Sequence, residues 1–248
     1  MKLLLHLGKQ VRTLPRKKIV FIIVEGPSDQ EALGAILSRL FPMDMIHVYI
    51  VYGDITTSKN VTSDKIVSEI GKMIKQYADQ NHFKPKDFKE IIHIVDTDGA
   101  FIPDSNVVEV QNINKTIYTI TEIQTAHREN ILKRNEQKSS NLNKLICCSK
   151  IWKVPYRVFY MSCNLDHVLH NKMNSSDEEK EQDAFIFAKK HRKETDDFCN
   201  FIVHSDFSVV DNYTYQSSWD YIKEDLHSLE RHSNFGLYLQ KKINIDSK

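Results

Sequence analysis

Residues 18–29 read KIVFIIVEGPSD, an apolar run that is followed at once by a glutamate and a glycine. The first seven residues are nearly all apolar and rich in β-branched side chains, which is typical of a strand buried on both faces of a sheet. Ser28 with Glu31 three residues later matches a helical capping box, and apolar residues then recur at helical spacing. This segment therefore predicts a buried strand that ends at Glu25 and leads directly into a helix.

The same alternation continues along the first hundred residues. Residues 47–52 and 90–95 have the composition of two more strands, and the spacing of apolar residues over 66–77 predicts a helix between them. Strands that alternate with helices are typical of a parallel sheet with right-handed crossovers. The sequence therefore predicts an α/β fold, built as an open parallel sheet with helices on its faces.

The second half of the chain has a different pattern. Thr121 and Gln124 match another capping box, and a polar, basic stretch follows that the Asn and Ser residues at 139–143 should divide into two helices. The expected strands lie at 107–110, 116–120 and 156–161, and the expected helices at 177–193, 194–204 and 217–232. These elements predict a basic N-terminal arm at 1–17, an α/β domain at 18–169 with a helical insert at about 121–150, and a mostly helical C-terminal extension at 170–248.

The composition narrows the class of protein. The chain has 248 residues and a net charge of +1, so its overall charge does not indicate a polyanionic partner. Basic residues do concentrate in 1–18 and 115–157, which could contact phosphates or could be ordinary solvated surface. No segment approaches the ~20 apolar residues of a membrane span, and the four cysteines form no CxxC pair. We therefore expect a cytoplasmic protein with reduced thiols and no membrane association.

Acidic residues follow two of the predicted strands. Glu25 follows the first, and Asp96 and Asp98 follow the third within the sequence Val-Asp-Thr-Asp-Gly. The carboxyl ends of parallel strands meet in one crevice, and in an extended backbone Asp96 and Asp98 would point to the same side. Crowded carboxylates repel one another, and one or two Mg²⁺ or Mn²⁺ ions would relieve this repulsion. Asp29, four residues after Glu25, is either a further metal ligand or an acid favoured by the helix dipole.

These motifs resemble the Toprim domain, which occurs in topoisomerases, bacterial-type primases and several nucleases. The sequence Val24-Glu25-Gly26-x-Ser28-Asp29 is most similar to nucleases of the overcoming-lysogenization-defect (OLD) class and to their standalone relatives in phage-defence operons. The resemblance implies that Glu25 binds metal and handles protons, that Asp96 and Asp98 hold metal, and that Asp29 completes the site. It also suggests Asp166 for a second metal, although Asp166 could equally be a helix cap, and Lys153 or Lys172 for the scissile phosphate.

The resemblance also implies a substrate and a partner. It predicts a metal-dependent endonuclease that hydrolyses DNA or RNA in anti-phage defence by abortive infection. The chain contains no GxxxxGK[ST] motif, so any ATPase must be a separate polypeptide. Standalone members of the class pair with ABC-type ATPases, and we expect the same here, together with a possible homodimer.

Two other functions remain open from the sequence. Asp96-Thr97-Asp98-Gly99 also resembles the catalytic loop of haloacid-dehalogenase-like phosphohydrolases, with Asp96 as nucleophile and Asp98 as acid. In that family the loop usually follows the first strand and carries a threonine where this chain has Ala100. The third possibility is a Toprim-like module that binds a partner or senses a trigger without catalysis.

Overall fold

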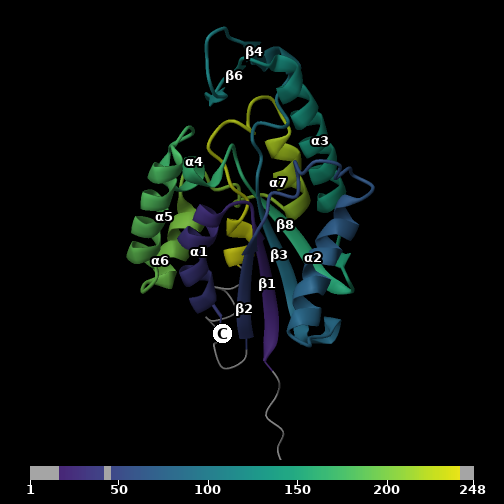
Figure 1. Ribbon diagram of the computed structural model, residues 1–248. Helices are drawn as coiled ribbons and strands as arrows, with labels where there is room; N and C mark the ends of the chain where they lie inside the picture. Colours follow the sequence, from purple (N-terminus) through teal and green to yellow (C-terminus); the bar gives the residue numbers. More distant parts are fainter. Residues whose placement is uncertain (1–16, 42–45, 241–248) are drawn as a thin grey trace, which may run out of the picture.

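The computed structural model describes residues 17–41 and 46–240, so the predicted basic arm lies outside the described residues except for Lys17. Its centre is a five-stranded sheet with the strand order β2-β1-β3-β8-β7 (Figure 1). The first four of these strands are parallel and β7 is antiparallel to β8, so the predicted α/β fold with a mainly parallel sheet is confirmed. The strands are β1 (Lys18–Val24), β2 (Ile46–Tyr52), β3 (Phe88–Asp96), β7 (Lys150–Ile151) and β8 (Val154–Met161).

Helices cover both faces of the sheet. Val20 and Ile22 of β1 point into one core and Phe21 and Ile23 into the other, because side chains alternate along a strand. The first core is closed by α1 (Pro27–Arg39), α4 (Leu165–His170), α5 (Asp177–His191) and α6 (Thr195–His204). The second is closed by α2 (Ile66–Gln80), α3 (Arg128–Ile146) and α7 (Tyr215–Ile222).

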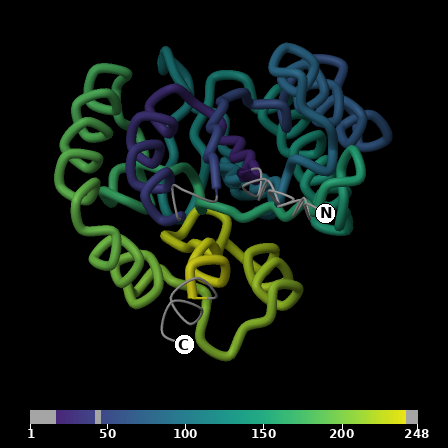
Figure 2. Tube along the Cα trace, turned by 90° about the horizontal axis from the view of Figure 1, so that it is seen from below, coloured from purple at the N-terminus to yellow at the C-terminus, as the bar shows by residue number. Residues whose placement is uncertain are grey.

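The C-terminal part of the chain belongs to these same two cores. Trp219 and Phe235 are fully buried, one in each core. The backbone N–H of Tyr160 donates to Asn234 Oδ1 at 2.9 Å, and Ser233 bridges to Met161. In Figure 2, which looks along the strands from below, the C-terminal segments in yellow lie to one side of the central strands. The predicted extension therefore completes the fold around β8.

A small second layer lies over the carboxyl ends of the strands (Figure 1). It contains a three-stranded sheet in the order β4-β6-β5 and a third apolar cluster that includes Ile123 and Leu229. Gly99 lies beneath it with a φ of +66°, and a Cβ atom there would come within 2.6 Å of Leu229, so only glycine fits. The elements are β4 (Val107–Glu109), β5 (Ile117–Tyr118) and β6 (Ile123–Thr125), with a short 3₁₀ turn at Asp104–Asn106 before β4; another 3₁₀ turn, Pro85–Asp87, precedes β3 at the opposite end of the central sheet.

Two predicted helices are wrong in extent. The insert forms one helix instead of two, α3, which begins after His127, and Gln124 of the predicted Thr121–Gln124 capping box lies in β6. Asn141 does not break α3, because its side-chain amide donates to the carbonyls of Thr56 and Val61. The predicted helix at 217–232 ends as α7 at Ile222.

The first helix begins differently from the prediction. α1 starts at Pro27 with Gly26 as its N-cap, and Asp29 Oδ2 accepts a 2.8 Å hydrogen bond from the Gly26 N–H. The predicted box of Ser28 with Glu31 is therefore wrong, because proline at the first helical position sets the start of the helix earlier. Within residues 17–41 and 46–240, none of the helices is both long enough and apolar enough to span a bilayer.

Candidate active site

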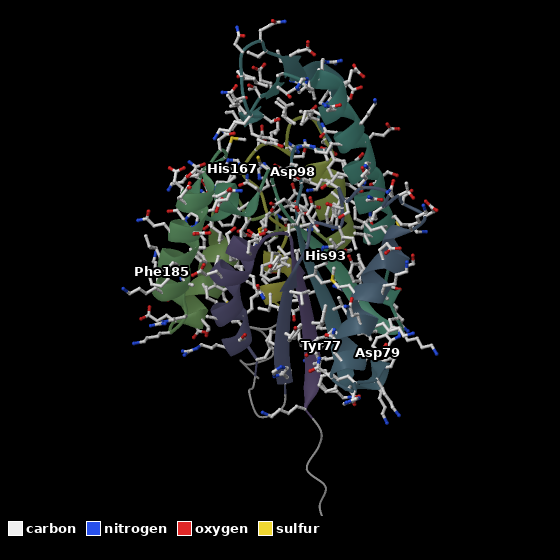
Figure 3. All side chains as sticks on the ribbon, in the orientation of Figure 1. Tyr77, Asp79, His93, Asp98, His167 and Phe185 are labelled. Atoms are coloured by element: carbon white, nitrogen blue, oxygen red, sulfur yellow. The ribbon has the colours of Figure 1, made fainter. Side chains whose placement is uncertain are left out.

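Three neighbouring strands each deliver an acidic side chain at their carboxyl ends. Glu25 follows β1, Asp96 ends β3, and Asp54 follows β2, where the N–H of Gly53 donates to the carbonyl of Val24 at 2.9 Å. In Figure 3, Asp98 lies at this upper edge of the sheet, above His93 in the middle of β3. The crevice expected at the ends of parallel strands is therefore lined by acids.

A buried lysine lies among these acids. Lys138 comes from the middle of α3, its side chain is 0% exposed, and its Nζ atom is 3.2 Å from Glu25 Oε2. The same Nζ also contacts Asp98 Oδ2. A buried ammonium group is tolerable only when carboxylates compensate its charge. Lys138 therefore joins the acid of β1 to the acid that follows β3.

The backbone turns sharply between Asp96 and Asp98. β3 ends at Asp96, Thr97 donates through its hydroxyl to the carbonyl of Ser228 at 2.7 Å, and Asp98 has a φ of +49°. The carbonyl of Asp98 accepts a 2.8 Å hydrogen bond from Arg134 Nη2. The expectation of an extended Asp-x-Asp segment is therefore wrong: Asp98 turns to Lys138, whereas Asp96 lines a cleft on the side of α1.

Asp54 and Thr56 support Glu25 from the loop after β2. Asp54 Oδ1 accepts hydrogen bonds from the Thr56 N–H at 3.1 Å and from its hydroxyl at 2.9 Å. The Thr56 hydroxyl also lies 3.3 Å from Glu25 Oε1. Because Lys138 contacts the other oxygen of Glu25, both oxygens of this carboxylate are held in place.

A cleft opens on the opposite side of Glu25, between α1 and α5. Its volume is about 530 Å³, and Glu25, Asp29, Asp96 and Lys180 are among its lining residues. Asp166, in the first turn of α4, is close enough to Asp29 to raise the pKa of that carboxyl. Asn164, not Asp166, caps α4 with its side chain. Asp29 therefore lines the cleft, and Asp166 lies close to Asp29 without lining the cleft itself.

Burial and crowding disfavour the ionised forms of these acids. Burial raises the pKa of Glu25 to about 8, against the opposing effect of Lys138 and with further increases from Asp54 and Asp98. Burial also raises the pKa of Asp29 to about 6 and that of Asp96 well above its usual value, where Glu25 and Asp29 add to the effect. At neutral pH Glu25 therefore holds a proton that a cation could replace, and the ionised forms of Asp96 and Asp29 are disfavoured.

The pKa values of Asp54 and Lys138 shift in the directions that favour the charged forms of these two side chains. Burial would raise the pKa of Asp54, but Lys138 and the hydrogen bonds from Thr57 and Thr56 lower it below the usual range. Burial would lower the pKa of Lys138, but Asp98, Glu25 and Asp54 hold it above its ordinary value. One fixed positive charge therefore lies between ionised and protonated acids.

This arrangement predicts a pH dependence of stability in metal-free protein. Glu25 ionises near pH 4 when unfolded and near pH 8 when folded, so between these values the folded state binds more protons and stability falls as pH rises. Buried histidines such as His93, whose pKa is lowered to about 3, act in the opposite direction, but only below about pH 6.5. In EDTA, the melting temperature should therefore decrease from pH 7 to pH 9. The decrease should be smaller for Glu25→Gln, and equal slopes for the two proteins would contradict the assignment.

The chemistry of the acids fits a hard divalent cation, although a complete cage is not assembled. Among the described residues, no three His, Cys, Asp or Glu side chains are placed to hold one metal ion together. The oxygen donors of Glu25, Asp96 and Asp98 are nevertheless those that Mg²⁺ and Mn²⁺ prefer. Lys138 contacts two of these three carboxylates, so it supplies positive charge at the centre of the donor set.

The two lysines selected from the sequence are not part of this site. Lys153 lies in the turn before β8, at the end of that strand opposite the carboxyl edge. Lys172 is half-exposed and pairs with Asp183 at 2.6 Å. The lysines that the structure places at this site are Lys138 and Lys180.

Three residues of the site were not predicted from the sequence, and two of them have a recognisable sequence pattern. Lys138 precedes Leu142 by four residues and Leu145 by seven, so it occupies a core position on the buried face of α3. Asp54 follows a strand in the same way as Glu25, and the rule that identified Glu25 would have identified it. Lys180 has no such signal, because nothing in the sequence indicates that α5 lies beside α1.

No protein-family model, curated protein or solved structure matches this chain. Function is therefore inferred from the geometry and chemistry of the site itself.

Proposed function

We propose that this protein is a metal-dependent nuclease that hydrolyses phosphodiester bonds in DNA or RNA, with Glu25, Asp96 and Asp98 at its centre. The observation that carries the proposal is the convergence of these acids at the ends of adjacent strands, around the buried cation Lys138. Perturbed carboxyl groups in a cleft are typical of functional sites, because burying repelling acids costs stability without a structural benefit.

Each residue has a distinct role in the proposal. One or two Mg²⁺ or Mn²⁺ ions, held by Glu25, Asp96 and Asp98, would activate water and neutralise charge on the phosphate. Glu25, whose pKa is about 8, is suited to exchange a proton with water near neutral pH. Lys138 provides a fixed positive charge that attracts the phosphate group. Asp29 and Asp166 extend the donor set on the side of the cleft.

We extend the proposal to the cellular role that the resemblance implies. The chain would act in the cytoplasm as the effector of an anti-phage, abortive-infection system, and a separate ABC-type ATPase would control it. The absence of an ATPase motif supports a separate partner. Dimerisation on activation would be one way to position the substrate.

The test is cleavage by purified protein. Supercoiled plasmid and total RNA are incubated with the chain and Mg²⁺, Mn²⁺ or EDTA, with and without the neighbouring gene product. We expect cleavage that requires the divalent cation. Absence of cleavage under all of these conditions, together with tight binding to an ATPase, would favour a non-catalytic Toprim-like module instead.

The alternative function, a haloacid-dehalogenase-like phosphohydrolase, proceeds by a different mechanism. It requires a covalent aspartyl-phosphate on Asp96. The loop that carries Asp96 follows the third strand along the chain rather than the first, and Ala100 stands where that family usually has threonine. Trapping a beryllium fluoride adduct on Asp96 would nevertheless establish the alternative and overturn the nuclease proposal.

A further inference from the structure

A separate groove lies along the outer side of α2, where that helix meets the end of α3 and the short strand β7. Its volume is about 860 Å³. Its polar rim carries four lysines and one carboxylate. These residues are Lys72, Lys75, Lys144, Lys150 and Asp64.

The positive charge of the groove is mostly uncompensated. Lys72 pairs with Glu69 at 2.6 Å on the same helix. Within the described part of the chain, the other three lysines form no ion pair, and all three are exposed. Exposed lysines brought together from α2, α3 and β7 attract a polyanion.

An aromatic side chain is held at the same groove by an unusual turn. Trp152 and Lys153 connect β7 to β8, and both have left-handed backbones, with φ values of +49° and +66°. Hairpin turns of this kind normally use Asn-Gly, because other residues are strained there. The ring of Trp152 contacts Phe88 edge-on at 5.7 Å and lines the groove while remaining partly exposed.

We propose that this groove binds a single-stranded segment of nucleic acid. The lysines contact backbone phosphates and Trp152 stacks on a base, which is the combination that single-strand binding uses. A stacked base must be unpaired, so the geometry favours single strands over duplex. The proposed nuclease function supplies the reason for such a surface: Lys144 lies only six residues, or about 9 Å along the axis of α3, from Lys138 in the candidate active site.

The proposal is tested by direct binding rather than by cleavage. Fluorescein-labelled 20-nucleotide single-stranded DNA and RNA are titrated with Glu25→Gln protein, and anisotropy is recorded between 50 and 200 mM NaCl. The added substitutions Lys75→Gln, Lys144→Gln and Lys150→Gln should weaken binding by about 10-fold or more. They should also reduce the magnitude of the slope of log K against log salt concentration by about 2, because each of the three lost phosphate contacts contributes about 0.7 to the slope for a single strand.

The matched control removes the same charge elsewhere. Lys189, Lys190 and Lys193 are exposed at and just beyond the end of α5, and their replacement by glutamine should leave the affinity within about 2-fold. Equal losses in the two triple variants would show that only net charge matters and would overturn the proposal. So would competition by polyglutamate as strong as competition by unlabelled oligonucleotide, which would assign the groove to an acidic protein segment.

Tryptophan fluorescence provides an independent measurement. The other tryptophan, Trp219, is fully buried, so quenching by an oligonucleotide would report on Trp152. We expect quenching that disappears in Trp152→Phe, together with at least about 5-fold weaker binding. Absence of quenching at saturation would contradict the stacking role.

The outcomes for the groove and for the active site are distinguishable. Groove-dependent binding without any cleavage by the wild-type chain would support the groove and contradict the nuclease. Cleavage by a groove variant with unchanged KM would support the nuclease and contradict the groove.

Discussion

Replacing Glu25 with glutamine should reduce divalent-cation-dependent cleavage by about 100-fold or more without unfolding the chain. Both carboxylate oxygens of Glu25 have a partner in the site: one lies near the Thr56 hydroxyl and the other near Lys138. Glutamine retains the size and the hydrogen-bonding capacity of this side chain but removes its charge and its proton exchange. Rates of plasmid or RNA cleavage at saturating Mg²⁺ measure the effect.

The same substitution should leave the melting temperature unchanged or higher at pH 8. Ionising a buried carboxyl whose pKa is raised to about 8 opposes folding, and the amide does not ionise. Glu31→Gln is the matched control, because it makes the same chemical change at an exposed residue of α1 at the rim of the same cleft. We expect the control to cleave within about 3-fold of wild type. A Glu25→Gln protein with normal cleavage, or with a strongly lowered melting temperature, would make Glu25 a structural residue instead.

The central sheet could be predicted from the sequence because its strands are buried on both faces. β1 and β3 are nearly continuous apolar runs, and this pattern identifies a central parallel strand without knowledge of its neighbours. The position of Glu25 and Asp96 at one edge followed from the direction of these strands. That part of the site depends only on local pattern and on the general geometry of parallel sheets.

The remainder of the site depends on contacts between distant segments. Asp98 leaves the extended conformation because Ser228, 130 residues further along the chain, accepts the hydroxyl hydrogen bond of Thr97. Lys138 has the polarity of a surface residue, and only the acids that face it make its burial possible. Helical spacing places Lys138 on the buried face of α3, but no local pattern identifies the acids that face it or the turn at Asp98.

The position at which α7 ends is also set by contacts between distant segments of the chain. Spacing alone extends the helix to residue 232, because Ile222, Leu226 and Leu229 recur at helical intervals. Leu229 instead packs on Ile123 beneath the three-stranded sheet, and the chain must leave the helix to reach it. Tertiary packing therefore overrides the helical pattern here.

Replacing Lys138 with methionine should produce the largest loss of stability of any substitution in the site. Removing one partner of a buried ion pair typically costs about 3–5 kcal/mol, because the remaining charges are left without compensation. For a domain of this size, each kcal/mol corresponds to about 2–4 °C, so the melting temperature should fall by roughly 6–20 °C at pH 8. Differential scanning fluorimetry of the metal-free proteins measures the difference, and Lys144→Met, at an exposed position on the same helix, is the control.

The pH dependence and a double variant separate loss of charge from simple misfolding. Without Lys138, nothing opposes the increase in the pKa of Glu25, so the folded variant takes up a proton that the unfolded chain releases above pH 4. Its stability should therefore keep falling above pH 8, where the wild-type carboxyl ionises in the folded state as well, so the loss relative to wild type should be larger at pH 9 than at pH 6. Adding Glu25→Gln to Lys138→Met removes the acid that is left unpaired and should restore part of the melting temperature at pH 8. A loss that is the same at pH 6 and pH 9, and that Glu25→Gln does not reduce, would mean that Lys138 contributes by packing its aliphatic chain rather than by balancing the charge of the site.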